Sequence, residues 1–284
     1  MKEIIICSDG SLYAPSVYEH AAWAAEKENA SVRCLHVIER GEKYHPNDYS
    51  GSIGFDASAE LLEELVEQDV ANARIARKRG AAILEDARRS LAQHLDEKRI
   101  QTKLVHGSLV ENLQDLEHEA DLIVLGKRGE HADFSKGHIG SNLERVARGV
   151  KAPILVAARA FKKPSRALLA YDGGVSSHRA VEHLASHNLL KGMSCQLVAV
   201  GESGGHLARR LDEAQEKLSA QGIEAKAELL QGDPDEIISQ KVKEDGYDLL
   251  IMGAYGHSRI RQFILGSTTT TLLRTCHVPV LLFR

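Results

Sequence analysis

The sequence predicts an α/β fold that is built twice along one chain. Short runs of Ile, Val and Leu without polar alternation are typical of strands that are covered on both faces of a parallel sheet. Segments with helical spacing separate these runs, as in a doubly wound sheet. The same order of elements occurs in residues 1–160 and in residues 161–284, so we expect two domains over these ranges.

The repeat is visible in the residues themselves. The segment Glu3–Gly10 (EIIICSDG) matches Arg166–Gly173 (RALLAYDG), and the equivalent residues lie 163 positions apart. The runs that end at Gly126 and Gly253 match at an offset of 127. The difference of 36 residues is extra sequence in the first half, which we place around residues 41–77.

We expect five strands in each half. In the first half they lie near residues 3–8, 31–38, 100–106, 121–126 and 153–158. In the second half they lie near residues 166–171, 194–200, 223–230, 248–253 and 278–283.

Three helix boundaries carry local signals. Ser108 followed by Glu111 has the pattern of a capping box. Asp233 followed by Pro234 predicts an N-cap with proline in the first helical position, and Gly246 predicts the end of that helix.

The extra segment divides into two parts. Residues 41–57 contain Gly, Pro, Asn and Ser and indicate a loop, whereas residues 58–98 have apolar residues at helical spacing and indicate one long amphipathic helix or two. The segment is either a lid or partner surface, or a solvated excursion with a helix packed on the domain.

Composition excludes several classes of function. With 36 Lys and Arg against 40 Asp and Glu the formal charge is −4, and no basic block favours nucleic acid. No apolar run approaches the roughly 20 residues of a membrane span. We expect a cytoplasmic protein whose four cysteines are free thiols, because they form no Cys-x-x-Cys pair.

A phosphate cradle without a Walker sequence is the main chemical signal. In the second half an apolar run ends at Gly253, and Gly256 and the segment Gly266-Ser267-Thr268 follow. Glycines let backbone N–H groups approach an anion, and a helix that begins at Gly-Ser presents amides and its positive end. The first half repeats the pattern with the residues Gly126, Gly129, Gly140, Ser141 and Asn142.

These residues resemble the universal stress protein family. The resemblance rests on Gly-x2-Gly-x9-Gly-Ser/Thr, on Asp-Gly after the first strand, and on closing strands with Ala152-Pro153-Ile and Val278-Pro279-Val. It covers essentially the whole chain outside the insert, as a tandem of two family domains. It implies two open five-stranded parallel sheets in the order 3-2-1-4-5, of the adenine nucleotide alpha hydrolase-like type. It further implies that the last strands of the halves pair as a pseudo-dimer, with a homodimer also possible.

The resemblance also implies a ligand, ATP with Mg²⁺ or Mn²⁺, at the switch point between the first and fourth strands. Val200 would contact adenine through its backbone, and Asp172 would serve the ribose or a metal. The full set of expected second-half contacts is Ala170, Tyr171, Asp172, Val200, Met252, Gly253, Gly256, His257, Gly266, Ser267 and Thr268. The first-half equivalents are Asp9, Val37, Gly126, Gly129, Gly140, Ser141 and Asn142.

Several alternatives stay open. The first half has ten residues rather than nine between Gly129 and Gly140, so we expect the second-half site to be the better formed. The glycines could simply make turns, the aspartates could only cap helices, and Lys127 with Arg128 could be solvated instead of meeting phosphate. His183 and His187 lie four apart and could hold a metal, but no third ligand is evident and we assign no metal site.

No catalytic residue is assigned, because the nucleotide-hydrolase, nucleophile-elbow and zinc-protease motifs are absent. The favoured function is a regulatory, stress-response ATP-binding module with slow or no hydrolysis. The alternatives are a nucleotide-free scaffold and a weak ATPase.

Overall fold

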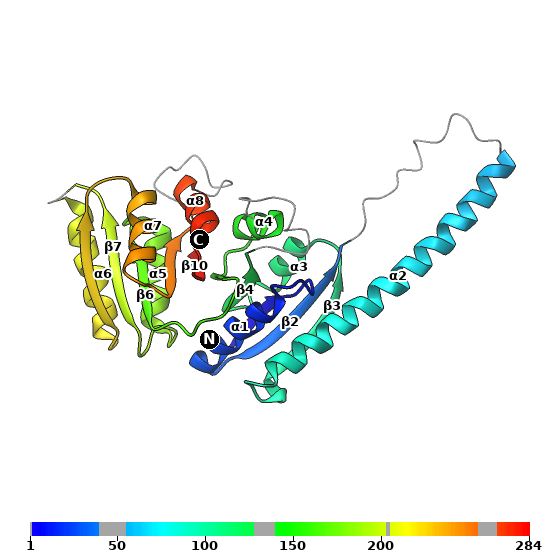
Figure 1. The fold of residues 1–284 in the computed structure, drawn as a ribbon, viewed down its shortest axis with the longest axis horizontal. Coiled ribbons are helices and arrows are strands. Elements are labelled where there is room, and N and C mark those ends of the chain that lie inside the picture. Colours follow the sequence, from blue (N-terminus) through cyan, green and yellow to red (C-terminus); the bar gives the residue numbers. More distant parts are fainter. Residues whose placement is uncertain (1, 40–54, 128–139, 203–204, 255–265) are drawn as a thin grey trace.

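The computed structural model describes residues 2–39, 55–127, 140–202, 205–254 and 266–284, and within them the chain forms a single ten-stranded sheet. The strand order is β3-β2-β1-β4-β5-β10-β9-β6-β7-β8 (Figure 1). Each half therefore has the predicted order 3-2-1-4-5, with parallel neighbours throughout.

All ten predicted strands are present within two residues of their expected bounds. The first half contains β1 (Glu3–Cys7), β2 (Ser31–Ile38), β3 (Ile100–His106), β4 (Leu122–Gly126) and β5 (Ile154–Ala157). The second contains β6 (Arg166–Ala170), β7 (Ser194–Val200), β8 (Glu224–Leu230), β9 (Leu249–Gly253) and β10 (Val280–Phe283).

Helices connect the strands in both halves. They are α1 (Ala14–Glu28), α2 (Phe55–Leu91), α3 (Leu109–Leu116) and α4 (Ser141–Gly149) in the first half, and α5 (Val175–Ser186), α6 (His206–Ala220), α7 (Pro234–Glu244) and α8 (Ser267–Thr275) in the second. A 3-10 turn, Glu97–Arg99, precedes β3.

The core lies on both faces of the sheet, which explains the apolar runs without alternation. Ile4 and Ile6 of β1 face a cluster that includes α1, α2, α5 and α6, whereas Ile5 faces a second cluster with α3, α4, α7 and α8. A strand that is buried on both faces needs apolar residues at every position.

The helix-boundary signals have different outcomes. Asp233 caps α7 as predicted, since its Oδ1 accepts hydrogen bonds from the N–H groups of Asp235 and Glu236 at 2.9 and 3.1 Å. The predicted capping box at Ser108 is wrong, because Ser108 is the N-cap of α3 but its side chain makes no capping bond. The side chain of Asn112 instead donates to the carbonyl of Ser108 at 2.9 Å.

An antiparallel contact joins the halves. Strands β5 and β10 pair with Val156 opposite Val280 and Leu155 opposite Leu281, as the resemblance implied for the last strands. Both Leu155 and Leu281 are almost completely buried. This pairing covers two apolar edges that would otherwise be exposed to aggregation.

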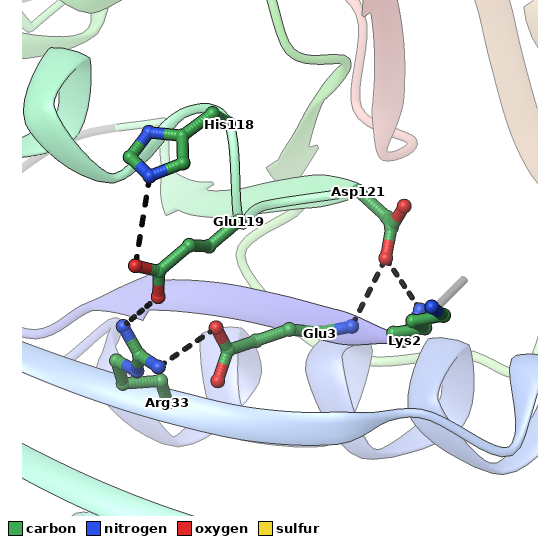
Figure 2. Close-up of polar contacts among 6 residues, drawn as sticks. All are labelled: Lys2, Glu3, Arg33, His118, Glu119 and Asp121. Atoms are coloured by element: carbon green, nitrogen blue, oxygen red, sulfur yellow. Dashed lines mark hydrogen bonds and ion pairs between the residues drawn. The ribbon is translucent and has the colours of Figure 1, made fainter.

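A repeated aspartate fixes the amino-terminal edge of each half. In the first half Asp121 accepts hydrogen bonds from the N–H groups of Lys2 and Glu3, while Arg33 bridges Glu3 and Glu119 (Figure 2). Burial acts to raise the pKa of Asp121, but these N–H donors outweigh it and lower the pKa below its usual value.

Asp248 is the equivalent residue in the second half. It accepts hydrogen bonds from the N–H and hydroxyl groups of Ser165 at 3.2 and 2.7 Å, and it forms an ion pair with Lys162. The aspartate that opens each Asp-Leu-(Leu/Ile) run is therefore a structural clamp at the edge opposite the carboxyl ends of the strands.

The insert contains one long helix rather than two. Helix α2 has 37 residues and begins at Phe55, so the end of the segment that we predicted as a loop is helical. Its C-terminal part buries Leu84, Ala87 and Leu91, at the positions where α6 buries Leu211, Ala214 and Leu218. The N-terminal part extends away from the body of the molecule (Figure 1).

We expect Leu155→Ala to lower the free energy of unfolding by about 2–5 kcal/mol, because it leaves a cavity at the β5–β10 junction. The measurement is urea unfolding followed by circular dichroism. Ile75→Ala is the control, since Ile75 is 64% exposed and should change stability by less than about 0.5 kcal/mol. Equal effects of the two substitutions would contradict a buried junction.

Candidate functional site

Four chain segments meet where β6 and β9 end. These strands are neighbours, with Ala170 opposite Met252. Asp172 and the start of α5 follow β6, while Gly253 ends β9 and α8 begins at Ser267. The chain leads from β6 to β7 on one side of this point and from β9 to β10 on the other. Open α/β sheets bind ligands in a crevice at such a point, and we refer to this position as the crevice of the half.

Asp172 shapes the turn into α5. Its Oδ1 accepts hydrogen bonds from the N–H of Gly174 at 2.8 Å and from the hydroxyl of Ser177 at 2.6 Å. Gly173 has a φ of +70°, a conformation that favours glycine. The carboxylate therefore fixes the turn between β6 and α5.

Gly253 is required by close packing. A Cβ on Gly253 would lie 2.9 Å from the Cβ of Ser176 and 3.4 Å from the backbone nitrogen of Ser177. Its carbonyl accepts a hydrogen bond from the hydroxyl of Thr269 at 3.1 Å. Gly253 thus brings the start of α5 and the start of α8 together, and Thr269 is a site residue that the sequence analysis did not select.

The start of α8 is suited to an anion. Gly266 is the N-cap and contributes no side-chain hydrogen bond, and the first turn contains no acidic residue. The N–H groups of the first helical residues have no intrahelical acceptor. Ser267 is exposed and Thr268 is half-buried, so these groups border the surface.

The structure adds Arg210 of α6 to this region. Its Nη1 donates to the carbonyl of Gly173 at 2.6 Å. Burial raises the pKa of Tyr171, and the positive charge of Arg210 acts in the opposite direction. Nothing in the local sequence singles out Arg210, because its position depends on how α6 packs over β6 and β7.

Two exposed apolar residues occupy equivalent places in the halves. Leu12 is 92% exposed and Val175 is 72% exposed, and they lie 163 positions apart, three residues after Asp9 and Asp172. Each lies in the segment that follows the first strand of its half. The repeat offset was the signal that could have identified them.

The other second-half candidates lie around this point or outside the described residues. Tyr171 and Met252 are buried, whereas Ala170 and Val200 are half-buried at the ends of β6 and β7. Gly256 and His257 lie outside the described residues, as does Gly129 of the first half.

The first-half crevice has the same frame but different chemistry. Asp9 accepts a hydrogen bond from the N–H of Ser11 at 2.9 Å, and Gly10 has a φ of +71°. A Cβ on Gly10 would lie 2.7 Å from Ile83 of α2, which occupies the position of Arg210 in the repeat. An apolar side chain therefore replaces a cation.

The start of α4 is also less suited to an anion. It begins after Gly140, with Ser141 and Asn142 exposed, but Glu144 lies in its first turn. The side-chain oxygen of Asn142 accepts a hydrogen bond from Arg145 at 2.6 Å. The remaining candidates, Val37 and Gly126, are half-buried at the ends of β2 and β4.

Lys127 points to the other half of the molecule. Its ammonium donates to the carbonyl of Cys276, the C-cap residue of α8. In the same manner Arg284 donates to the carbonyl of Arg148 near the end of α4. Each half therefore contributes a positively charged side chain to the C-terminal end of the last helix of the other half, where positive charge is favourable.

His183 and His187 form a stacked pair, with ring centroids 4.0 Å apart, and His183 also packs on Phe283. The described part of the chain contains no group of three or more His, Cys, Asp or Glu residues that could hold a metal. Among the described residues, no helix has the combination of length and hydrophobicity needed to cross a bilayer.

Comparison with known proteins places both halves in one family. The model of the "Universal stress protein family" matches residues 1–158 and again residues 164–284. Universal stress protein Slr1230 of Synechocystis is 38% identical over 288 residues and covers all of both chains. Universal stress protein Rv1996 of Mycobacterium tuberculosis is 21% identical, over 99% of this chain and 94% of its own.

Solved structures share the fold over the whole length. A universal stress protein from Archaeoglobus fulgidus superimposes with a TM-score of 0.70 at 21% identity, covering 99% of this chain and 98% of its own. A functionally unknown protein, PA1789, from Pseudomonas aeruginosa gives a TM-score of 0.62 at 14% identity, covering 100% and 92%.

The histidine pair predicts a pH dependence of stability. Burial, followed by the neighbouring His187, lowers the pKa of His183 to about 4 from an ordinary value of 6.5. The unfolded chain therefore binds more protons between these values, so stability should be highest above pH 6.5 and fall as the pH decreases towards 4.

The measurement is the urea midpoint as a function of pH. His183→Leu should flatten this dependence, while the same change at exposed His178 should not. An NMR titration of His183 with an ordinary midpoint would contradict the proposed cause.

Proposed function

Because this chain belongs to the universal stress protein family, we propose that its second half binds ATP and that the protein acts as a regulatory, stress-response module. The observation that carries the proposal is the start of α8. There a glycine N-cap, helical amides that have no intrahelical acceptor and a first turn without acidic residues lie next to Gly253, the end of β9.

The phosphates would lie at Gly266, Ser267 and Thr268. Backbone N–H groups and the positive helix end favour a multiply charged anion at this point. Gly253, with Gly256 and His257 beyond it, would line the same cradle. Arg210, which donates to the carbonyl of Gly173, adds a positive charge near the crevice.

The base and ribose would lie towards β6 and β7. Val200 would contact adenine through its backbone, with Ala170, Tyr171 and Met252 forming the floor. Val175 offers an exposed apolar side chain beside Asp172. Oδ1 of Asp172 already accepts hydrogen bonds from Gly174 and Ser177, and we assign the carboxylate a contact with the ribose or with a cation that the phosphates bring.

Mg²⁺ or Mn²⁺ fits this arrangement only together with the nucleotide. Such ions are held by one or two carboxylates plus phosphate oxygens and water. Asp172 is the carboxylate that could contribute here. The cation would neutralise phosphate charge and hold the phosphates in position.

The regulatory role follows from the way the halves are joined. We propose that residues 1–160 and 161–284 act as the two members of a pseudo-dimer, in which a bound nucleotide favours one arrangement of the loop after β9. The four free cysteines fit the reducing cytoplasm that we propose as its location.

There are two alternatives to regulatory ATP binding, one for each half. Ile83 beside Gly10, together with Glu144 at the start of α4, favours a nucleotide-free scaffold role for the first half. A weak ATPase is the alternative for the second half, where Asp172 is the residue on which hydrolysis would depend.

The substitution Ser267→Glu tests anion binding at the start of α8 in a protein that should still fold. A carboxylate in the first turn stabilises a helix by about 0.3–1 kcal/mol, while it repels phosphate. We therefore expect ATP affinity to fall at least tenfold, by isothermal titration calorimetry, without loss of thermal stability. Nucleotide released by boiling the purified wild-type protein, and absent from the variant, would support the same conclusion.

Ser141→Glu is the matched change in the first half. If only the second half binds, this variant keeps the wild-type affinity and stoichiometry. Unchanged ATP binding in Ser267→Glu, or a wild-type protein that binds no ATP, would refute the proposed site.

The third test separates binding from turnover. We expect phosphate release in the presence of ATP and Mg²⁺ to be no faster for the wild-type protein than for Asp172→Ala, when both are purified in the same way. Sustained turnover that Asp172→Ala abolishes would establish the ATPase alternative instead.

A further inference from the structure

Among the described residues, no other segment of the chain covers the N-terminal part of α2. From Glu64 to Arg79 every side chain is exposed apart from the half-buried Ala76. Val66 and Val70 are 60% and 64% exposed, which is unusual for valines in the middle of a 37-residue helix. Figure 1 shows this part extending beyond the sheet and the other helices.

The exposed valines continue the buried face of the same helix. Val66, Val70 and Ala73 follow one another at spacings of four and three residues. Continued along the chain, this seven-residue pattern passes through the exposed Arg77 and then reaches positions that are buried against the body, namely Gly80, Leu84, Ala87 and Leu91. One stripe, apolar except at Arg77, therefore runs along α2, with one end covered by the protein and the other end exposed.

Charge is separated along the exposed part. Residues 56–69 contain six acidic side chains and no basic one, whereas residues 70–79 contain four basic side chains and no acidic one. Glu67 and Arg74 are seven residues apart, so they lie on the same flank of the stripe. The helix is thus acidic towards its N-terminus and basic towards the body.

The charge pattern of this exposed part is complementary to the same pattern on a second helix that runs in the opposite direction. We propose that the exposed stripe binds the same stripe of a second copy, with the two α2 helices antiparallel across a two-fold axis near Val70 and Ala71. Glu67 then lies opposite the partner's Arg74, and Glu64 opposite the partner's Arg77. Val66, Val70 and Ala73 of both copies form the apolar seam.

Other occupants fit the same surface less well. A parallel pair would place acid against acid and base against base, which is destabilising. A membrane or nucleic acid would attract residues 70–79 but repel the acidic block that shares the stripe. Only a partner with the reversed charge order satisfies both ends, and a second copy has that order.

The test is a charge exchange measured by sedimentation equilibrium. One variant carries Glu63→Lys, Glu64→Lys and Glu67→Lys, and the other carries Arg74→Glu, Arg77→Glu and Lys78→Glu. We expect each variant alone to dimerise at least tenfold more weakly than the wild-type chain, and an equimolar mixture to regain a dimer. Recovery in the mixture also shows that both variants still fold.

Cross-linking separates the two flanks of the helix. A short bismaleimide should link Val70→Cys into a dimer but not Ile75→Cys, although both positions are 64% exposed. Glu213→Lys with Glu216→Lys on α6 is the control for surface charge and should leave the dimer unchanged. A wild-type chain that stays monomeric, or a dimer that neither charge variant weakens, would overturn the proposal.

Discussion

The antiparallel pairing of β5 with β10 is the constraint on which the rest of the structure depends. Each strand has four apolar residues and would form an exposed edge in a half that stood alone. Their pairing makes two five-stranded sheets into one and reverses the strand direction at the junction. Lys127 and Arg284 add bonds across the same boundary, so the halves are held by backbone, apolar and charged contacts together.

Within this frame the two copies have kept their geometry and changed their chemistry. The glycine after each first-strand aspartate has the same positive φ, and the aspartate before each fourth strand clamps the same edge. The residues around the two equivalent strand ends differ, because Ile83 takes the place of Arg210 and Glu144 lies in the first turn of α4, whereas the first turn of α8 has no acidic residue. The two halves therefore share a backbone frame but differ in charge at this point.

The sequence predicted what depends on local pattern. Strand positions followed from apolar runs, and Asp233 capped its helix because a cap needs only neighbouring residues. The resemblance supplied the strand order and the pairing of the last strands. Ser108 occupies the N-cap position of α3 without the side-chain bond of a capping box, although the sequence pattern is present.

Contacts between segments that are distant in the sequence could not be predicted from local sequence patterns. The place of Arg210 beside Gly173 depends on how α6 packs, and the bond from Thr269 to Gly253 depends on the meeting of α8 with β9. The start of α2 was placed too late because Phe55, Asp56 and Ala57 directly follow a segment rich in Gly, Pro, Asn and Ser.

The ends of α8 show how the halves can influence one another. Its N-terminus borders the second-half crevice, and its C-terminus receives the ammonium of Lys127, which follows Gly126 at the end of β4. A cation at a helix C-terminus and an anion at the N-terminus stabilise the same dipole, each by about 0.3–1 kcal/mol. Helix α4 is placed in the same way, since Arg284 follows β10 and donates near its C-terminus. Each of these helices therefore begins beside the strand ends of its own half, while its C-terminal end is held by a cation from the other half.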